Sequence, residues 1–350
     1  MSCSLVGSEM CIRDRFVAFE HNIRRSATMK PKKILALFAA GMISFATSAN
    51  AAYNLTLCGA SPGGLWSMLG AGVDAAVKKS HPGSIVTYQT SGGGFANVGL
   101  LEQGKCDLAL IHDAEAVLAR DGKAPFKEPI DGIRTVAVMY TWAPMQMIMN
   151  KDFAKKHGIS KLSDIAKNKA PVRVLLNKRG NVASQVGASM LAAAGADADQ
   201  IKSWGGDVVF AASKEQGELM RDRRADVLLN SLFVNHRSIR QLAEALDLVL
   251  VEIDSDATSS VTADWNIGTY TIENSAYDWS SSDVVTPTLS AQLFVRADAD
   301  PKMVSDVTTA LVENIELVRG VHKAMKPLSV GLMGGSKAIS YHPQAKAAYN

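Results

Sequence analysis

Two consecutive strand, turn and helix units between residues 55 and 113 constrain the fold of this chain more than any other feature. In each unit a short apolar segment runs into a turn rich in serine and glycine, and a helix-forming segment follows. A third apolar segment, residues 107–112, closes the region. This alternation predicts a parallel sheet flanked by helices. Because parallel strands end at one edge of a sheet, we expect both turns to present backbone N–H groups there, at helix N-termini that favour small anions.

The same alternation returns between residues 172 and 253 and predicts a second sheet. Two apolar strands, 133–140 and 145–150, are separated by residues 141–144, where Pro144 marks a break and a candidate hinge. Residues 255–290 are polar and turn-rich, so we expect a partly structured return segment before a strand at 291–296. A helix from Pro301 to about residue 318 and a helical tail complete the chain.

These elements predict an α/β fold of two lobes, each a mostly parallel sheet flanked by helices, with a ligand cleft between the lobes. Residues 52–142 plus 288–350 are predicted to form lobe I, and residues 143–287 to form lobe II. Two crossings of the chain between the lobes would allow hinge closure around a ligand.

The N-terminal segment has the pattern of a secretory signal. Residues 29–33 are basic, residues 34–45 form a short apolar core, and an A-x-A cleavage site ends at residue 51. Residues 29–51 are therefore predicted to be a signal peptide, which places the mature protein in the periplasm. Residues 1–28 are interpreted as an upstream or adapter-derived extension, because residues 8–15 resemble a translated sequencing adapter.

The basic character of the whole chain belongs to this leader. Residues 1–51 hold seven of the 37 basic residues and three of the 34 acidic ones. The remainder therefore carries 30 basic and 31 acidic residues, a net charge of −1. This balance gives no indication of a nucleic-acid partner.

Two of the four cysteines, Cys58 and Cys106, remain after the leader. They could pair in an oxidising compartment. Cys58 ends the first predicted strand, whereas Cys106 precedes a parallel neighbour, so we expect them at opposite ends of the sheet. Two buried free thiols are the prediction, with a disulfide as the alternative.

Several short segments, taken in order, resemble the TAXI family of solute-binding proteins of tripartite ATP-independent periplasmic (TRAP) transporters. The matching segments are residues 61–64, 91–93 with Asn97, 104–110, 191–195, 268–270, 293–301 and 342–343. The resemblance implies a periplasmic-binding-protein type II fold. It also implies a receptor that delivers a carboxylate-bearing solute to integral membrane subunits of a TRAP transporter. Glutamate, glutamine or a dicarboxylate such as 2-oxoglutarate is the solute that the resemblance suggests.

The first lobe supplies most of the predicted binding residues. The anion-binding turns are predicted to consist of Ser61, Gly63, Gly64, Ser91, Gly92 and Gly93. The alternative is that these glycines only permit tight turns. His112 and Asp113 stand at the carboxyl end of a strand, where they either contact ligand or cap the next helix. Trp66 either walls the cleft or belongs to the core.

The second lobe is predicted to close the far side of the cleft. Arg179 could clamp a carboxylate with both of its terminal nitrogens. The turn around it departs from the Gly-Ser-Gly-Thr-Glu type of the family, which leaves ligand identity open. Asn230 and Phe233 follow the strand at 227–229 and are predicted to form another wall. The further candidates in the Arg179 turn are Asn181, Ser184 and Gln185.

Enzymatic alternatives are weaker. Residues 59–63 match the G-x-S-x-G pattern of a nucleophile elbow, which would make Ser61 the nucleophile of an exported hydrolase. Pro62 argues against this, because an oxyanion hole needs the backbone N–H of the residue after the nucleophile. The histidines show no metal-binding spacing, and no cofactor is predicted. We therefore predict a binding protein and not an enzyme. A sensing module for a signalling partner would have the same fold.

Overall fold

Three parallel strands begin the sheet of the first lobe. The computed structural model describes residues 52–350, and the predicted signal peptide and upstream extension lie outside the described residues. The strands are β1 (Asn54–Cys58), β2 (Ile85–Gln89) and β3 (Leu108–His112), paired in the order β2-β1-β3. The helices that connect and follow them are α1 (Leu65–Ser80), α2 (Gly94–Glu102) and α3 (Asp113–Arg120). The two predicted strand, turn and helix units are confirmed.

The second lobe repeats this arrangement. Its parallel strands are β5 (Arg173–Leu176), β6 (Asp207–Phe210) and β7 (Val227–Ser231), paired in the order β7-β5-β6. A short strand, β8 (Leu248–Leu250), pairs antiparallel with the end of β4 (Ile133–Asn150). The helices of this lobe are α4 (Lys151–His157), α5 (Asp164–Lys167), α6 (Val182–Ala193), α7 (Ala198–Ser203), α8 (Ser213–Arg221), α9 (Arg237–Ala243) and α10 (Ser255–Trp265).

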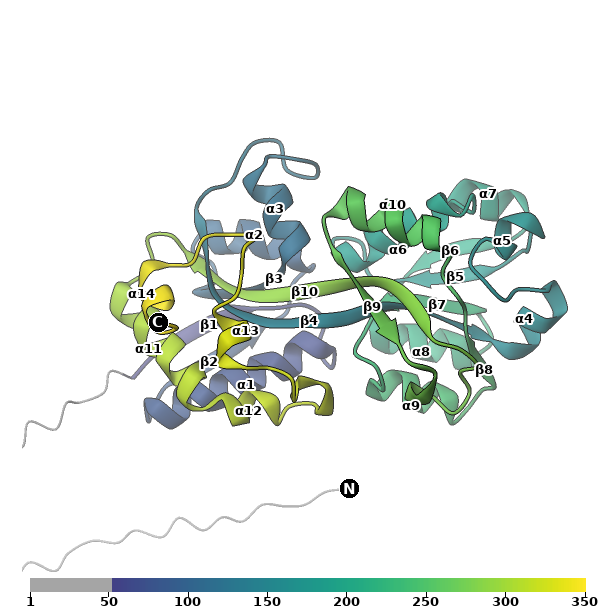
Figure 1. The fold of residues 1–350 in the computed structure, drawn as a ribbon. Helices are drawn as coiled ribbons and strands as arrows, with labels where there is room; N and C mark the ends of the chain where they lie inside the picture. Colours follow the sequence, from purple (N-terminus) through teal and green to yellow (C-terminus); the bar gives the residue numbers. More distant parts are fainter. Residues whose placement is uncertain (1–51) are drawn as a thin grey trace, which may run out of the picture. The chain divides into compact units, whose positions relative to one another are not determined.

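Two long antiparallel strands, β4 (Ile133–Asn150) and β10 (Val284–Arg296), run through both lobes (Figure 1). The predicted break at residues 141–144 is wrong, because β4 is continuous. Pro144, paired with Thr288, is the last residue of the β4 ladder with β10, and the ladder with β7 starts at the next residue, Met145. A proline at such a position removes no hydrogen bond from the middle of a ladder.

The return segment is more ordered than its composition predicts. It contains α10, the 3₁₀ helix η1 (Asn274–Ala276) and β9 (Gly268–Ile272), which pairs antiparallel with the start of β10. The tail packs on the first lobe, as predicted (Figure 1). It consists of α11 (Pro301–Glu313), α12 (Ile315–Arg319), the 3₁₀ helix η2 (Lys323–Met325), α13 (Val330–Met333) and α14 (Pro343–Ala347). Within residues 52–350, none of the helices combines the length and the apolar character that a membrane crossing requires.

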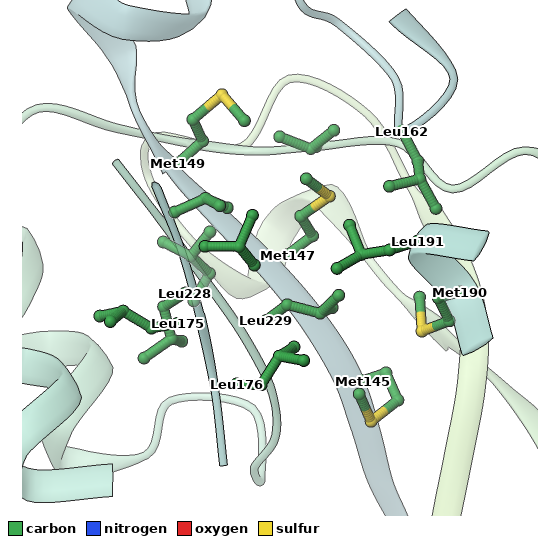
Figure 2. Packing of buried hydrophobic residues seen from close by; sticks show 14 of the residues in the cluster. Met145, Met147, Met149, Leu162, Leu175, Leu176, Met190, Leu191, Leu228 and Leu229 are labelled. Atoms are coloured by element: carbon green, nitrogen blue, oxygen red, sulfur yellow. The ribbon is translucent and has the colours of Figure 1, made fainter. Parts of the chain in front are cut away.

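The buried side chains divide between the two lobes. On β4, Ala143 belongs to a first-lobe cluster and Met145 to the second-lobe cluster. On β10, Ala291 belongs to the first-lobe cluster and Leu289 to the second-lobe cluster. Figure 2 shows methionines of β4 packed beside leucines of β5, β7 and α6 in the second lobe. The cores therefore change over close to the predicted lobe boundaries, which themselves stay a prediction.

Cys58 and Cys106 form a disulfide, so the expectation of two free thiols is wrong. Their Cα atoms are 5.9 Å apart. The expectation failed because β3 starts beside the end of β1: Leu57 pairs with Leu108 and Cys58 with Ala109. Cys106, two residues before β3, therefore lies next to Cys58, the last residue of β1.

Candidate ligand-binding cleft

A cavity of about 70 Å³ lies between the lobes, at the carboxyl ends of β1, β3, β5, β6 and β7. Ligands of open parallel α/β sheets bind at this edge, because turns and helix N-termini gather there. A space of this size holds a few water molecules or a small solute. The predicted residues that line it are Ser61, Gly64, Trp66, His112 and Asn181.

The turn between β1 and α1 offers backbone donors to the cavity. The N–H groups of Ser61, Gly63 and Gly64 find no acceptor within residues 52–350. Gly64 is the N-cap of α1 and provides no side-chain cap, which leaves the first N–H groups of the helix available. Gly63 has a φ of 73°, a left-handed conformation that glycine adopts readily. This end of α1 is partly positive and suited to an anion.

An aromatic cluster forms the floor of the cavity. The indole Nε1–H of Trp66 donates to the hydroxyl oxygen of Tyr140 at 3.0 Å, and the Trp66 ring lies 4.7 Å from the ring of His112. Burial raises the pKa of Tyr140, so its hydroxyl keeps its proton. That proton has no acceptor in the described part of the chain and is free for a ligand. His112 Nδ1 lies 3.0 Å from Glu115 Oε2, which leaves Nε2 as the ring nitrogen available to a ligand.

Two helix N-termini approach the cavity from the second lobe. α8 has Ala212 as its N-cap and no side-chain cap. Ser213, at its first position, accepts a hydrogen bond from Asn230 Nδ2 at 3.2 Å, so its own hydroxyl proton is free. α6 is capped by Asn181, whose Oδ1 accepts from Ala183 N at 2.9 Å. The Asn181 amide nitrogen is left as a donor on the cavity wall.

The N-terminus of α6 is filled by a carboxylate of the protein itself. Glu115 Oε1 accepts from Val182 N at 2.9 Å, across the two lobes. The predicted clamp in this turn is therefore not assembled. Arg179 lies 3.7 Å over the ring of Phe210, and Ser184 Oγ donates to the carbonyl of Asn181. Gln185 lies half-buried on α6 outside the cavity lining.

The turn after β2 does not reach the cavity either. Ser91 Oγ lies 2.5 Å from the carbonyl oxygen of Gly59 and accepts from Gly93 N at 3.0 Å, so the turn is closed by its own side chain. Gly93 instead packs on Gly180 of the second lobe: a Cβ at Gly93 would lie 2.6 Å from the Gly180 oxygen. Neither Ser91, Gly92 nor Gly93 lines the cavity. Their placement in an anion site is a correction to the prediction.

Three further predicted residues support the cavity from behind. Asp113 is half-buried beside Ser290 and Gln292, and the burial of its carboxyl group raises its pKa. Asn230 is fully buried, and its Nδ2 donates to Gln216 at 2.9 Å as well as to Ser213. Phe233 is fully buried in the core, where its ring contacts that of Tyr140 at 5.0 Å.

The sequence has a family match along nearly its whole described length. The model of the NMT1-like family matches residues 57–350. This protein belongs to the NMT1-like family. No curated protein sequence matches it significantly.

Solved structures confirm the fold of this NMT1-like protein. MatC from Rhodopseudomonas palustris, with bound malate, aligns with a TM-score of 0.53 and 15% identity over 78% of this chain and 88% of MatC. The periplasmic binding protein BugD aligns with a TM-score of 0.50 and 11% identity, over 77% of this chain and 86% of BugD. PhnD1 from Prochlorococcus marinus, in complex with methylphosphonate, aligns with a TM-score of 0.50 and 12% identity, over 77% of this chain and 89% of PhnD1. The two-lobed α/β fold is therefore confirmed.

Sequence reasoning missed several lining residues of the NMT1-like protein. They are Tyr140, Asn177, Ser213 and Lys214. Tyr140 lies in an apolar strand that gave no polar signal. The other three follow β5 and β6, so the rule used for β1 and β2 would have found them.

An outer cavity of about 570 Å³ adjoins the inner one and shares Ser213 and Lys214 with it. Its wall carries Lys214, Arg221 and Arg237 against one carboxylate, Glu218. Glu218 lies 3.8 Å from the Lys214 ammonium. The entrance therefore has a positive balance that attracts anions, although residues 52–350 as a whole carry a net charge of −1.

The hydrolase alternative gains no geometric support. Ser61 and His112 both line the cavity, but no hydrogen bond joins them within the described residues. Pro62 also lacks the N–H that an oxyanion hole needs. Across residues 52–350, no group of three His, Cys, Asp or Glu side chains is placed to hold a metal ion.

Proposed function

We propose that this NMT1-like protein is a periplasmic receptor that captures a small carboxylate-bearing solute between its lobes. The observation that carries the proposal is the set of unpaired donors around the inner cavity: the uncapped N-termini of α1 and α8 and the hydroxyl proton of Tyr140. Donors that converge on a small, partly enclosed space stabilise negative charge without a metal. The cationic entrance adds attraction at long range.

The ligands in related folds support an anion. MatC binds malate and PhnD1 binds methylphosphonate. Together with the TAXI resemblance, this favours glutamate, glutamine or a dicarboxylate such as 2-oxoglutarate. We further propose that residues 29–51 export the protein and that integral membrane subunits of a TRAP transporter receive the solute.

A thermal-shift screen of residues 52–350 against amino acids and di-acids tests the proposal. A solute at about 100 times its dissociation constant adds about 2.7 kcal/mol to the free energy of unfolding, which raises the melting temperature visibly. Each acid is paired with its uncharged amide or ester. Equal responses to acid and neutral analogue, or no response to any acid, would contradict the carboxylate proposal.

Tyr140→Phe tests the donor set directly. Loss of one hydrogen bond to a charged ligand is expected to weaken binding of the stabilising acid by about 1.5–3 kcal/mol, about 10-fold or more, in titration calorimetry. Tyr53→Phe is the matched control, because its hydroxyl bonds Asp306 away from the cavity. Unchanged affinity in Tyr140→Phe would remove Tyr140 from the site.

A further inference from the structure

A third cavity, of about 860 Å³, lies beside the crossing strands β4 and β10. It shares no lining residue with the inner or the outer cavity of the cleft. We call it the hinge groove. Its aromatic and basic side chains are Trp142, Tyr270, Arg240, His322, Lys323 and Lys326. Phe233 separates it from the cleft: the Phe233 ring contacts Tyr140 on the cleft side, and Trp142 and His322 on the groove side.

The charge of the hinge groove is one-sided. No aspartate or glutamate lines it. Within residues 52–350, Arg240, Lys323 and Lys326 form no ion pair, and all three are exposed. Burial, and after it the charge of Arg240, lowers the pKa of His322, so Arg240 and His322 are close enough to repel one another. Because residues 52–350 as a whole carry a net charge of −1, such a concentration of unpaired cations indicates a site for negative charge.

The floor of the groove is aromatic. Trp142 and Tyr270 are half-buried, and the Trp142 ring stacks on Phe233 with a centroid distance of 6.5 Å. Tryptophan, tyrosine and arginine are the residues that concentrate binding energy at protein interfaces. A free inorganic anion would use the cations but not this apolar floor. The combination fits a polypeptide segment that carries both carboxylates and an aromatic side chain.

Both lobes contribute to the groove. His322, Lys323 and Lys326 belong to the C-terminal segment that packs on the first lobe, whereas Arg240 lies on α9 and Tyr270 on β9. The groove therefore has this shape only in this arrangement of the lobes. An occupant that contacts both sides stabilises that arrangement by its differential affinity.

We propose that the hinge groove docks an acidic polypeptide segment of a partner protein. Its carboxylates pair with Arg240, Lys323 and Lys326, and an aromatic side chain packs on Trp142. The proposal is independent of the solute that the cleft binds.

The test uses residues 52–350 and a short synthetic peptide of glutamates around one phenylalanine, labelled for fluorescence anisotropy. The triple variant Arg240→Glu, Lys323→Glu, Lys326→Glu is expected to weaken peptide binding at least 10-fold, and added salt is expected to weaken the wild-type complex. The matched control reverses three exposed, unpaired lysines elsewhere, Lys155, Lys156 and Lys202, with the same change in net charge. The control is expected to bind within about twofold of wild type.

Two outcomes would overturn the proposal. One is equal loss of binding in the triple variant and the control, which would mean unspecific attraction. The other is inorganic phosphate competing as well as the peptide, with no loss when phenylalanine is replaced by alanine in the peptide, which would make the groove a small-anion site.

Discussion

At the scale of single residues, Glu115 has more influence on the cleft than any residue that the sequence singled out. It is fully buried, and its two oxygens accept from Val182 N of the second lobe and from the backbone N and ring Nδ1 of His112. A carboxylate at the N-terminus of α6 satisfies the helix dipole. It thereby occupies the N-terminus of α6, next to the turn where Arg179 was predicted to clamp a carboxylate, and it orients the His112 ring at the cavity.

Glu115→Gln is expected to lower the free energy of unfolding by about 1–3 kcal/mol, because one amide oxygen cannot accept from three donors and at least one buried N–H loses its partner. Chemical unfolding monitored by circular dichroism measures this. Glu128→Gln, at an exposed site, is the control and should change stability by less than about 0.5 kcal/mol. Equal stability of the two variants would contradict the role of Glu115.

His236 makes the stability of the protein sensitive to pH. Burial and the neighbouring His322 and Arg240 lower its pKa from 6.5 to about 4. The unfolded chain therefore binds a proton in this window that the folded protein does not. The stability is complete above about pH 6.5 and falls by about 3 kcal/mol as the pH drops through 4.

His236→Asn tests this, because asparagine can still cap α9 as the His236 ring does. The difference in unfolding free energy between pH 7 and pH 4 should be about 3 kcal/mol smaller in the variant than in the wild type. The measurement is chemical unfolding at both values of pH. The same pH slope in both proteins would show that another group is responsible.

At the scale of elements, the register between β1 and β3 determines that Cys58 and Cys106 lie close enough to form a disulfide. The disulfide joins residues that are 48 positions apart, and the loop it closes contains α1, β2 and α2. Cys58→Ser with Cys106→Ser is expected to lower the free energy of unfolding by about 2–5 kcal/mol. A reducing agent should destabilise the wild type by a similar amount and leave the double variant unchanged. A count of two free thiols in unreduced, denatured protein of residues 52–350, which contains only these two cysteines, would refute the bond.

The crossing strand β4 was predicted as two separate strands, whereas the structure has one continuous strand. Both apolar segments were found, but Pro144 was interpreted as a break. A proline interrupts a strand only where its N–H would be needed, and Pro144 is the last residue of one ladder, directly before the next ladder starts. Whether the N–H is needed depends on neighbours far along the sequence.

At the scale of the whole molecule, the backbone of Gly93 limits how closely the lobes approach. Gly93 has a φ of 120°, a conformation that glycine adopts readily and other residues rarely do. Its Cα lies directly against the Gly180 carbonyl of the other lobe. Gly93→Ala is expected to shift the molecule towards an open form. The variant should have a larger radius of gyration in X-ray scattering and roughly 10-fold weaker solute binding, because only the closed fraction binds.

The control for this variant is Gly99→Ala in α2, the helix that Gly93 precedes, where the nearest atom to an added Cβ is 3.8 Å away. It should leave scattering and affinity unchanged. Backbone strain alone in Gly93→Ala would reduce stability without changing the scattering profile. That result would contradict a contact that limits closure.

Local patterning was sufficient to find most strands and helices, since apolar periodicity, glycine turns and chain order are properties of neighbouring residues. Of the residues predicted to bind ligand, Ser61, Gly64, Trp66, His112 and Asn181 line the cavity, and their role in binding stays a prediction. Local patterning failed for α10 and β9, because these elements are mostly polar and bury few residues, so their apolar periodicity is weak.

The sequence by itself determined the two-lobed α/β class and the edge of each sheet where a ligand would bind. Only the tertiary structure decided which donors remain free at that edge. Glu115 fills one helix N-terminus and Ser91 closes one turn, whereas the N-termini of α1 and α8 stay open. A hydrogen-bond donor is available to a ligand only if nothing else in the fold accepts from it, and that depends on contacts between residues far apart in the chain.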